Sequence, residues 1–374
     1  MVEYWRLLKL GGIDPLETQM VYEAVAISRE KGLIPDTIIF CWPKDPLVCI
    51  GFHQEVEKEI DLDYCKKINI PIVRRILGGG AVYLDAGQLF YQIIASEDNP
   101  KVPNTINKIF AKLLQAPILT YHDIGIPVEY KPINDIQIEG RKISGNGGGK
   151  VGNIDILTGN LILDFNYDQM VKILKVPSEK FRDKIASSLR ERLTTILRET
   201  GKEPDKDNLM TLLKKNFEKV LEIELQESQL TKDETVILSD LREKYLSNDW
   251  IFRTSLRHLD LLAKSQKITE TKRTIKIADG VFVSESVFKS VGGLIRVTME
   301  IVDKKINDIL ISGDFEFFPK EKLADLESQL VDLELDEDIL TKTVEQFYKD
   351  YEVQAPGTEP RDFVKTILQA VQKI

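Results

Sequence analysis

Two arginines and three consecutive glycines stand together in residues 73–85, Val-Arg-Arg-Ile-Leu-Gly-Gly-Gly-Ala-Val-Tyr-Leu-Asp. Glycine has no Cβ, so the backbone of Gly78, Gly79 and Gly80 can approach a ligand closely and adopt positive φ at little cost. Successive free N–H groups in such a turn form a concave anion site. The planar guanidinium groups of Arg74 and Arg75 suit a carboxylate or a phosphate. The segment predicts an anion-binding corner; the alternative is a glycine-rich hairpin turn between solvated arginines.

A second segment places a lysine beside glycines. Residues 134–149 read Asn-Asp-Ile-Gln-Ile-Glu-Gly-Arg-Lys-Ile-Ser-Gly-Asn-Gly-Gly-Gly. Alternating isoleucines over 136–143 predict a hairpin with one buried face that turns at Gly140. Lys142 then lies on a strand directly before a loop with four glycines between positions 145 and 149. This lysine could bind a carboxylate or phosphate; the alternative is a surface lysine on a hairpin.

In this order and spacing, the two segments resemble the lipoate–protein ligases, which share a catalytic fold with biotin ligases and octanoyltransferases. The similarity covers roughly residues 3–200 and continues at 50–54, 158–165 and 187–194. Residues 313–318, Gly-Asp-Phe-Glu-Phe-Phe, resemble a motif in the accessory domain of these ligases, although this similarity is weaker. Trp250 stands where the boundary tryptophan of that domain would be. An accessory domain distinguishes the ligases from the transferases, which are generally single-domain proteins.

The resemblance implies that ATP, with Mg²⁺, activates lipoate as an acyl-adenylate, and that a carrier lysine then attacks it. It implies that Lys142 is catalytic, bridging the lipoate carboxylate and the α-phosphate, and that Asp135 holds Mg²⁺. The expected partners are free lipoate or octanoate and a lipoyl carrier domain, such as that of a 2-oxoacid dehydrogenase E2 or the glycine cleavage H-protein. The residues expected to bind lipoate and adenylate are Arg75, Gly78, Gly79, Gly80, Ala81, Val82, Tyr83, Asn134, Asp135, Gly147, Thr158 and Gly159.

Three positions depart from the family pattern. Leu77 replaces a serine or threonine before the glycines, Leu84 replaces a histidine, and Thr158 replaces the histidine of a His-Gly pair. Leucine neither titrates nor forms side-chain hydrogen bonds, so contacts made by histidine or serine elsewhere are lost or supplied differently. The changes are compatible with an altered substrate or carrier, a specialised branch or a weakened enzyme.

Two other functions compete with the ligase. One is an acyltransferase that moves octanoyl or lipoyl groups between carriers without ATP, often through a cysteine thioester. None of Cys41, Cys49 and Cys65 lies in or after the lysine loop, which counts against it, and we interpret Cys41 and Cys49 as buried small hydrophobic residues. The other is a non-catalytic homologue that binds lipoylated partners.

The three histidines are scattered, which disfavours a histidine metal centre or a Ser-His-Asp hydrolase. We interpret His53 as a structural or surface residue, and no motif supports a function for His122 or His258. The net charge of −9 disfavours nucleic acid or an anionic membrane as the main partner. We expect neither a signal peptide nor a membrane span, because no apolar run approaches the roughly 20 residues needed, and we expect a cytoplasmic protein.

A length of 374 residues favours two domains. We predict a catalytic domain over 1–200, a charged helical bridge over 201–249 and an accessory domain over 250–374. The expected fold is α+β: a largely antiparallel mixed sheet flanked by helices, plus a smaller α+β domain at the C-terminus. Predicted elements include helices over 14–31, 61–68, 104–114, 319–330 and 337–350, paired strands over 36–42 and 46–52, a strand over 70–75, and C-terminal strands over 275–277, 281–283, 293–300 and 307–312.

Overall fold

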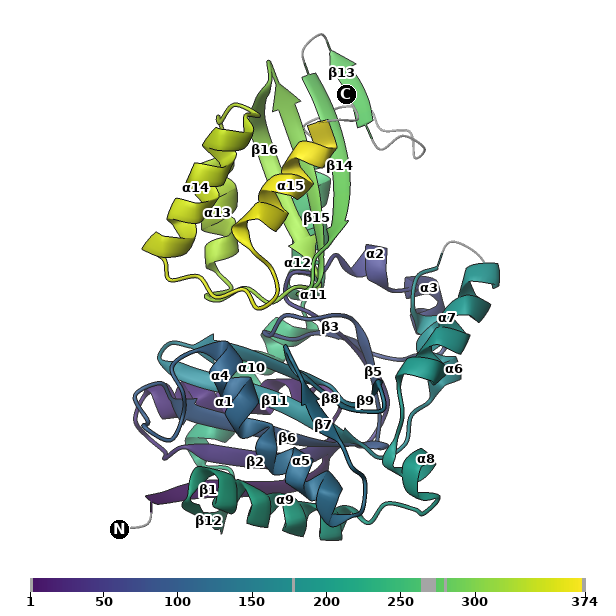
Figure 1. Ribbon diagram of the computed structural model, residues 1–374, viewed down its shortest axis with the longest axis vertical. Coiled ribbons are helices and arrows are strands. Elements are labelled where there is room, and N and C mark those ends of the chain that lie inside the picture. The colour runs from purple at the N-terminus through teal and green to yellow at the C-terminus, as the bar shows by residue number, and fades with distance from the viewer. Residues whose placement is uncertain (1–2, 177–178, 264–273, 279–280, 372–374) are drawn as a thin grey trace. The chain divides into compact units, whose positions relative to one another are not determined.

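The computed structural model describes residues 3–176, 179–263, 274–278 and 281–371 (Figure 1). The chain forms two compact units, and each is assembled from three stretches of sequence. Unit 1 consists of Met1–Cys49, Ile60–Ile76 and Ala81–Ser247; unit 2 consists of Ile50–Glu59, Leu77–Gly80 and Asn248–Ile374. Two short segments from the N-terminal half therefore belong with the C-terminal part of the chain.

Unit 1 is organised around a six-stranded mixed sheet. Its strands are β1 (Glu3–Ile13), β2 (Thr37–Pro43), β6 (Gln88–Ser96), β10 (Asn146–Val151), β11 (Ile154–Ile162) and β12 (Ile223–Ser228). They follow the order β10-β11-β6-β2-β1-β12. The pairs from β10 to β2 are antiparallel, whereas β2, β1 and β12 are parallel. β6 and β11 are buried along nearly their whole length, as strands covered on both faces should be.

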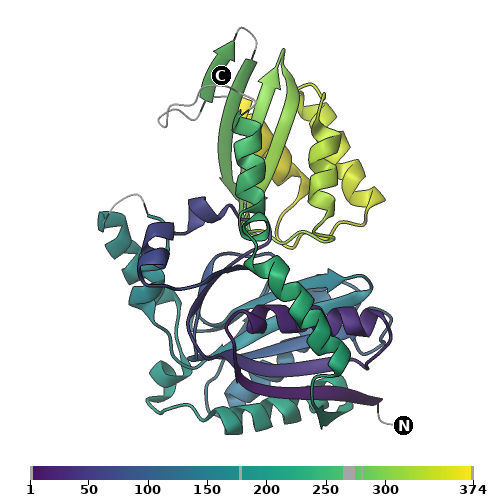
Figure 2. The ribbon, with the colours of Figure 1, turned by 180° about the vertical axis from the view of Figure 1, so that it is seen from behind.

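Helices cover both faces of this sheet. They are α1 (Glu17–Glu30), α4 (Ile106–Leu113), α5 (Gln115–Asp123), α9 (Lys206–Leu221) and α10 (Lys232–Leu246). α1 and α10 lie side by side on one face (Figure 2), where Gln92 Nε2 of β6 donates to the carbonyl of Thr18 at 2.9 Å. The preceding side chain, Tyr91, points to the opposite face, because side chains alternate along a strand. Its ring lies 5.9 Å from that of Phe217 in α9.

Two three-stranded sheets accompany the main sheet. One has the order β4-β3-β5, from β3 (Leu47–Ile50), β4 (Ile72–Arg74) and β5 (Val82–Leu84). The other has the order β7-β8-β9, from β7 (Glu129–Lys131), β8 (Asp135–Ile138) and β9 (Arg141–Ser144). The predicted pairing of the strands over 36–42 and 46–52 is wrong, because β2 pairs with β1 and β6 while β3 enters the first small sheet.

The segment 201–249, which we predicted to be a helical bridge, supplies α9, β12 and α10 to unit 1. β12 pairs in parallel with β1. α10 begins with a capping box made by Thr231 and Glu234. The buried carboxylate of Glu234 also pairs with Arg6 of β1, so the start of α10 is fixed to the sheet.

The predicted helices over 14–31, 61–68 and 104–114 are confirmed as α1, α3 (Leu62–Lys67) and α4. Asp61 caps α3 by accepting a hydrogen bond from the backbone N–H of Tyr64. Unit 1 also contains α6 (Tyr167–Ile173), α7 (Glu179–Arg192) and α8 (Ile196–Thr200).

Unit 2 contains a four-stranded antiparallel sheet. Its strands are β13 (Thr274–Ala278), β14 (Val281–Lys289), β15 (Leu294–Val302) and β16 (Lys305–Gly313), in chain order. On one face lie α13 (Lys322–Leu330), α14 (Glu337–Asp350) and α15 (Pro360–Val371), and this core includes Phe315 and Phe363. On the other face lies α12 (Arg253–Ala263), where Leu261 packs against Val283 and Leu310. Two short helices, α2 (Val56–Glu59) and α11 (Asn248–Ile251), also belong to unit 2.

This architecture confirms the expected α+β class, with mixed sheets flanked by helices and a smaller C-terminal unit. The predicted helices over 319–330 and 337–350 are confirmed as α13 and α14, whereas α15 was not predicted. Within the described ranges, no helix combines the length and the apolarity that a membrane span requires.

Candidate active site

The strand that carries Lys142 is held rigidly. β8 and β9 form the predicted hairpin around Gly140, which has φ of +77°. Ile143, the next residue after Lys142, is fully buried, whereas the Lys142 side chain is 40 % exposed. The backbone carbonyl of Lys142 accepts a hydrogen bond from the N–H of Thr194 at 2.8 Å. A fixed backbone thus presents an accessible ammonium group.

The Lys142 ammonium already contacts a carboxylate. Its Nζ lies 2.6 Å from Oδ1 of Asp135, which is 33 % exposed. Ion pairs with this much exposure add little to stability, because water screens both charges. The geometry is therefore compatible with an incoming anion that shares or replaces this pairing.

A buried amide relay connects the turn after β9 to the end of the glycine motif. Asn160 Oδ1 accepts from the N–H of Gly145 at 2.8 Å, and Asn160 Nδ2 donates to Gln88 Oε1 at 2.8 Å. Gln88 Nε2 in turn donates to the carbonyl of Tyr83 at 3.1 Å. A Cβ added at Gly145 would lie 3.8 Å from Lys142 Nζ, so the relay ends beside the lysine. Sequence reasoning missed both amides as site residues.

Asn134 and Gly159 have structural explanations. Asn134 Nδ2 donates to the carbonyl of Asn146 at 2.7 Å, and Asn146 Nδ2 returns a bond to the carbonyl of Asn134 at 2.8 Å. A Cβ at Gly159 would lie 2.0 Å from Asn146 Oδ1 and 2.5 Å from the Tyr91 ring, so this position requires glycine. Asn134 thus holds Asn146 by hydrogen bonds, and Gly159 leaves room for its side chain.

The glycine-rich stretch after Lys142 is a strand, which corrects the expected loop. Gly147 and Thr158 are opposite each other in the antiparallel pair of β10 and β11, at the edge of the main sheet. A Cβ at Gly148 would lie 2.7 Å from Ile106 Cδ1, so close packing against α4 explains that glycine.

Arg75 directly follows β4, Ala81 directly precedes β5, and Val82 and Tyr83 lie in β5 of the same small sheet. Arg75 Nη1 lies 3.6 Å from Cys49 Sγ, whereas Arg74 is fully buried, contrary to the solvated alternative. Tyr83 is also buried, and burial raises the pKa of its hydroxyl. Val82 exposes 36 % of its side chain.

The glycine triplet belongs to unit 2. A Cβ at Gly78 would lie 2.4 Å from Glu316 Oε2 and 2.8 Å from the carbonyl of Phe315, while a Cβ at Gly51 would lie 1.9 Å from the carbonyl of Gly79. The backbone of the triplet is closely approached by segments 50–51 and 315–316 of the protein, whereas the predicted approach was to a ligand. A ligand role for the triplet stays a prediction.

Two of the three departures from the family pattern, Leu77 and Leu84, are core positions. Leu77 is 2 % and Leu84 is 7 % exposed, so both leucines contribute apolar packing where polar side chains were expected. Thr158 is half-buried in β11. His53, as interpreted, has a structural role: it is buried and stacks on Phe315 with ring centroids 5.4 Å apart.

The three cysteines are all buried. Burial raises the pKa of the Cys41 and Cys49 thiols, and raises that of Cys65 to about 11. Since the thiolate is the reactive form, these environments disfavour nucleophilic chemistry. Among the described residues, no group of three or more histidine, cysteine or acidic side chains is arranged to hold a metal ion.

Comparison with protein families decides the broader assignment. The model of the lipoyl protein ligase A/B catalytic domain matches residues 14–218, more than half of the chain. The chain belongs to the lipoyl protein ligase A/B family. The model of the bacterial lipoate protein ligase C-terminus matches residues 284–367 of this family member, within unit 2.

Some relatives of this chain are named octanoyltransferases and others lipoate-protein ligases. Octanoyltransferase LipM of Moorella thermoacetica is 27 % identical over 67 % of this chain and 98 % of its own length. Lipoate-protein ligase A subunit 1 of Thermoplasma acidophilum is 32 % identical over 66 % of this chain and 95 % of its own length. A crystal structure of lipoate-protein ligase A bound with ATP matches at 27 % identity and a TM-score of 0.55, over 67 % of this chain and 99 % of that one.

Proposed function

We propose that this protein is an ATP-dependent lipoate–protein ligase, which forms lipoyl-AMP and transfers the lipoyl group to a lysine of a carrier domain. The observation that carries the proposal is the placement of Lys142: a 40 % exposed ammonium on a fixed strand, beside the Gly145 turn and 2.6 Å from Asp135. The match of residues 284–367 to the lipoate protein ligase C-terminus also favours a ligase.

In the proposed first step, a carboxylate oxygen of lipoate attacks the α-phosphorus of ATP. The bond from the α-phosphorus to the bridging oxygen breaks, and pyrophosphate leaves with that oxygen. The Lys142 ammonium would bind the lipoate carboxylate and the α-phosphate together, stabilising negative charge that increases during attack. The hydrogen bonds through Asn160 and Gln88 would keep a fixed distance between two elements: the Gly145 turn beside the ammonium, and the strand that carries Tyr83.

Asp135 fits the Mg²⁺ role because magnesium commonly binds through one or two carboxylates together with substrate phosphates. In the structure this carboxylate pairs with Lys142 and remains one-third exposed. A bound Mg²⁺ would neutralise charge on the phosphates. The proposal for Asp135 thus requires its carboxylate to contact both the Lys142 ammonium and Mg²⁺.

In the proposed second step, the amine of the carrier lysine attacks the acyl carbon of lipoyl-AMP. An amide bond forms, the acyl–phosphate bond breaks, AMP leaves, and the amine loses a proton to solvent. Holding both reactants in place would supply much of the rate. Lipoyl domains of the E2 or H-protein type are the proposed carriers.

The second candidate is an ATP-independent octanoyl or lipoyl transferase. The similarity to octanoyltransferase LipM favours it, because that relative matches along 98 % of its length. A thioester route would require a reactive cysteine, whereas Cys41, Cys49 and Cys65 are buried with raised pKa values. On this ground we place the ligase first.

The test is lipoate-dependent release of pyrophosphate from Mg-ATP. We expect release by the wild type and a loss of about 10²–10³-fold in Lys142→Ala, the size seen when one stabilising donor is removed. The matched control is Lys150→Ala on β10, whose lysine pairs with Asp155 at 3.4 Å and is similarly exposed. Absence of release from a folded, lipoate-binding wild type would refute the ligase and favour a transferase or a binding protein.

A further inference from the structure

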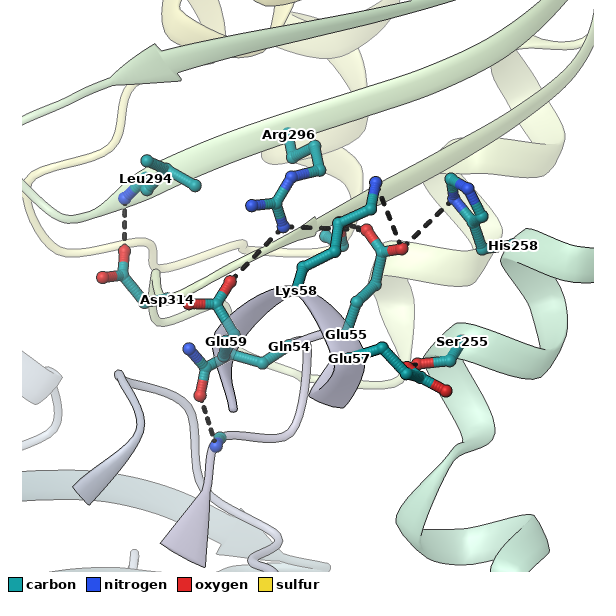
Figure 3. A network of polar contacts seen from close by, with 12 residues as sticks. Gln54, Glu55, Glu57, Lys58, Glu59, Ser255, His258, Leu294, Arg296 and Asp314 are labelled. Atoms are coloured by element: carbon teal, nitrogen blue, oxygen red, sulfur yellow. Dashed lines mark hydrogen bonds and ion pairs between the residues drawn. The ribbon is translucent and has the colours of Figure 1, made fainter. Parts of the chain in front are cut away.

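The segment 50–59 leaves β3 and is anchored in unit 2 by a group of charged side chains (Figure 3). At its centre is Glu55, which is 2 % exposed. We define the Glu55 cluster as Glu55, Lys58, His258, Glu285, Arg296 and Ser312. Its members come from the 50–59 segment, from α12 and from the strands β14, β15 and β16.

Both oxygens of the Glu55 carboxylate have partners. Oε1 accepts a hydrogen bond from Ser312 Oγ at 2.6 Å and lies 3.7 Å from Arg296 Nη1. Oε2 lies 3.2 Å from His258 Nδ1 and 3.4 Å from Lys58 Nζ. A buried charge is stable only when it is paired and hydrogen-bonded in this way. The cluster therefore holds the 50–59 segment in one position on unit 2.

Further contacts fix both ends of the same segment. Lys58 Nζ lies 2.8 Å from Glu285 Oε1, and Arg296 Nη1 lies 3.4 Å from Glu59 Oε1. At the other end, the carbonyl of His53 accepts a hydrogen bond from the N–H of Gly313 at 3.1 Å. The guanidinium of Arg253 lies over the Phe52 ring at 4.1 Å.

The 50–59 segment in turn supports the glycine loop, residues 77–80. The N–H of Phe52 donates to the carbonyl of Leu77 at 2.9 Å. Gly51 packs so closely on Gly79 that a Cβ would lie 1.9 Å from its carbonyl oxygen. A displacement of the 50–59 segment must therefore move the backbone of the glycine loop.

We propose that Glu55 is a positioning residue for the glycine loop: its cluster fixes the 50–59 segment, and that segment fixes the loop backbone for its predicted role in lipoate binding. This inference rests on the proposed function for its ligand, but the contacts that carry it lie within unit 2. Glu55 acts through the segment and does not itself touch the acid. Its removal should therefore change lipoate binding more than turnover.

The first arm of the test is amide hydrogen exchange of the full-length protein, and needs no activity. Glu55→Gln keeps the side-chain shape and removes the charge. The matched control is Asp308→Asn, which removes a buried carboxylate from another ion pair of unit 2, with Arg257 at 2.7 Å. We expect peptides that span 77–80 to exchange about tenfold faster in Glu55→Gln and unchanged in Asp308→Asn, because loss of a buried pair acts first on its neighbours. Equal acceleration in both variants, or in neither, would overturn the proposal.

The second arm measures lipoate-dependent pyrophosphate release. We expect the KM for lipoate to rise about tenfold in Glu55→Gln with kcat within about twofold of wild type, since a displaced binding loop weakens ground-state binding. Faster loop exchange with an unchanged KM would show that the loop does not position lipoate, and would overturn the inference. Absence of release from the wild type would remove the proposed ligase while the exchange arm still decides whether Glu55 positions the loop.

Discussion

Replacing Asn160 tests whether the buried amide relay holds the site around Lys142. Asn160 is 8 % exposed, and its amide joins the Gly145 N–H to Gln88. Asn160→Leu keeps the side-chain size but removes an acceptor and a donor. The N–H of Gly145 and the amide oxygen of Gln88 would then lose the partners they have in the structure.

The expected loss of stability follows from these two bonds. A buried polar group that loses its partner costs about 1–3 kcal/mol, so two such losses predict about 2–4 kcal/mol after relaxation. Because the turn next to Lys142 would also be released, we expect a further loss of about 10–100-fold in kcat/KM for lipoate at a temperature where the variant is folded.

The matched control is Asn216→Leu in α9. Asn216 is 2 % exposed and donates to Thr120 Oγ1 at 3.1 Å and to Asp123 Oδ2 at 3.0 Å. Chemical unfolding of both variants should give similar stability losses, whereas pyrophosphate release should fall only in Asn160→Leu. Equal activity of the two folded variants would refute the relay as a positioning element.

Two further predictions concern buried titratable groups. The thiols of Cys41, Cys49 and Cys65 should resist iodoacetamide at pH 8 in the folded protein, because all three are buried with raised pKa values; rapid labelling detected by mass spectrometry would contradict this and favour a thioester route. Burial raises the pKa of Glu327 from 4.5 to about 7, so the stability this carboxyl contributes is complete below pH 4.5 and is lost as the pH rises through 7. Relative to Glu327→Gln, the wild type should lose about 2–3 kcal/mol of unfolding free energy between pH 5 and pH 8, measured by denaturant titration, and a constant difference between the two proteins would refute it.

Local patterns in the sequence predicted the hairpin that carries Lys142. Isoleucine alternation fixed which face of β8 and β9 is buried, and Gly140 marked the turn. The same reasoning failed for β10, where glycines suggested a loop. These glycines instead lie in an edge strand that pairs with β11. Close packing against Ile106 of α4 explains why residue 148 is a glycine.

Local sequence patterns could not predict contacts between residues that are far apart in the chain. The strands over 36–42 and 46–52 were expected to pair because a short turn separates them, yet each enters a different sheet. Glu55 and Arg296 are 241 positions apart and Lys58 and Glu285 are 227 apart, so no periodicity links them. His258 lacked any motif and nevertheless contacts Glu55. Asn160 lay within a quoted motif, but its role depends on Gln88, 72 residues away.

The most direct measurement of the central claim is the amount of AMP formed for each lipoyl-lysine amide on a lipoyl carrier domain. The ligase account predicts one AMP per modified lysine, with both products absent when ATP is omitted and formed about 10²–10³-fold more slowly in Lys142→Ala. Modification of the carrier by an acylated donor protein, without ATP and without AMP, would contradict the account and establish the transferase.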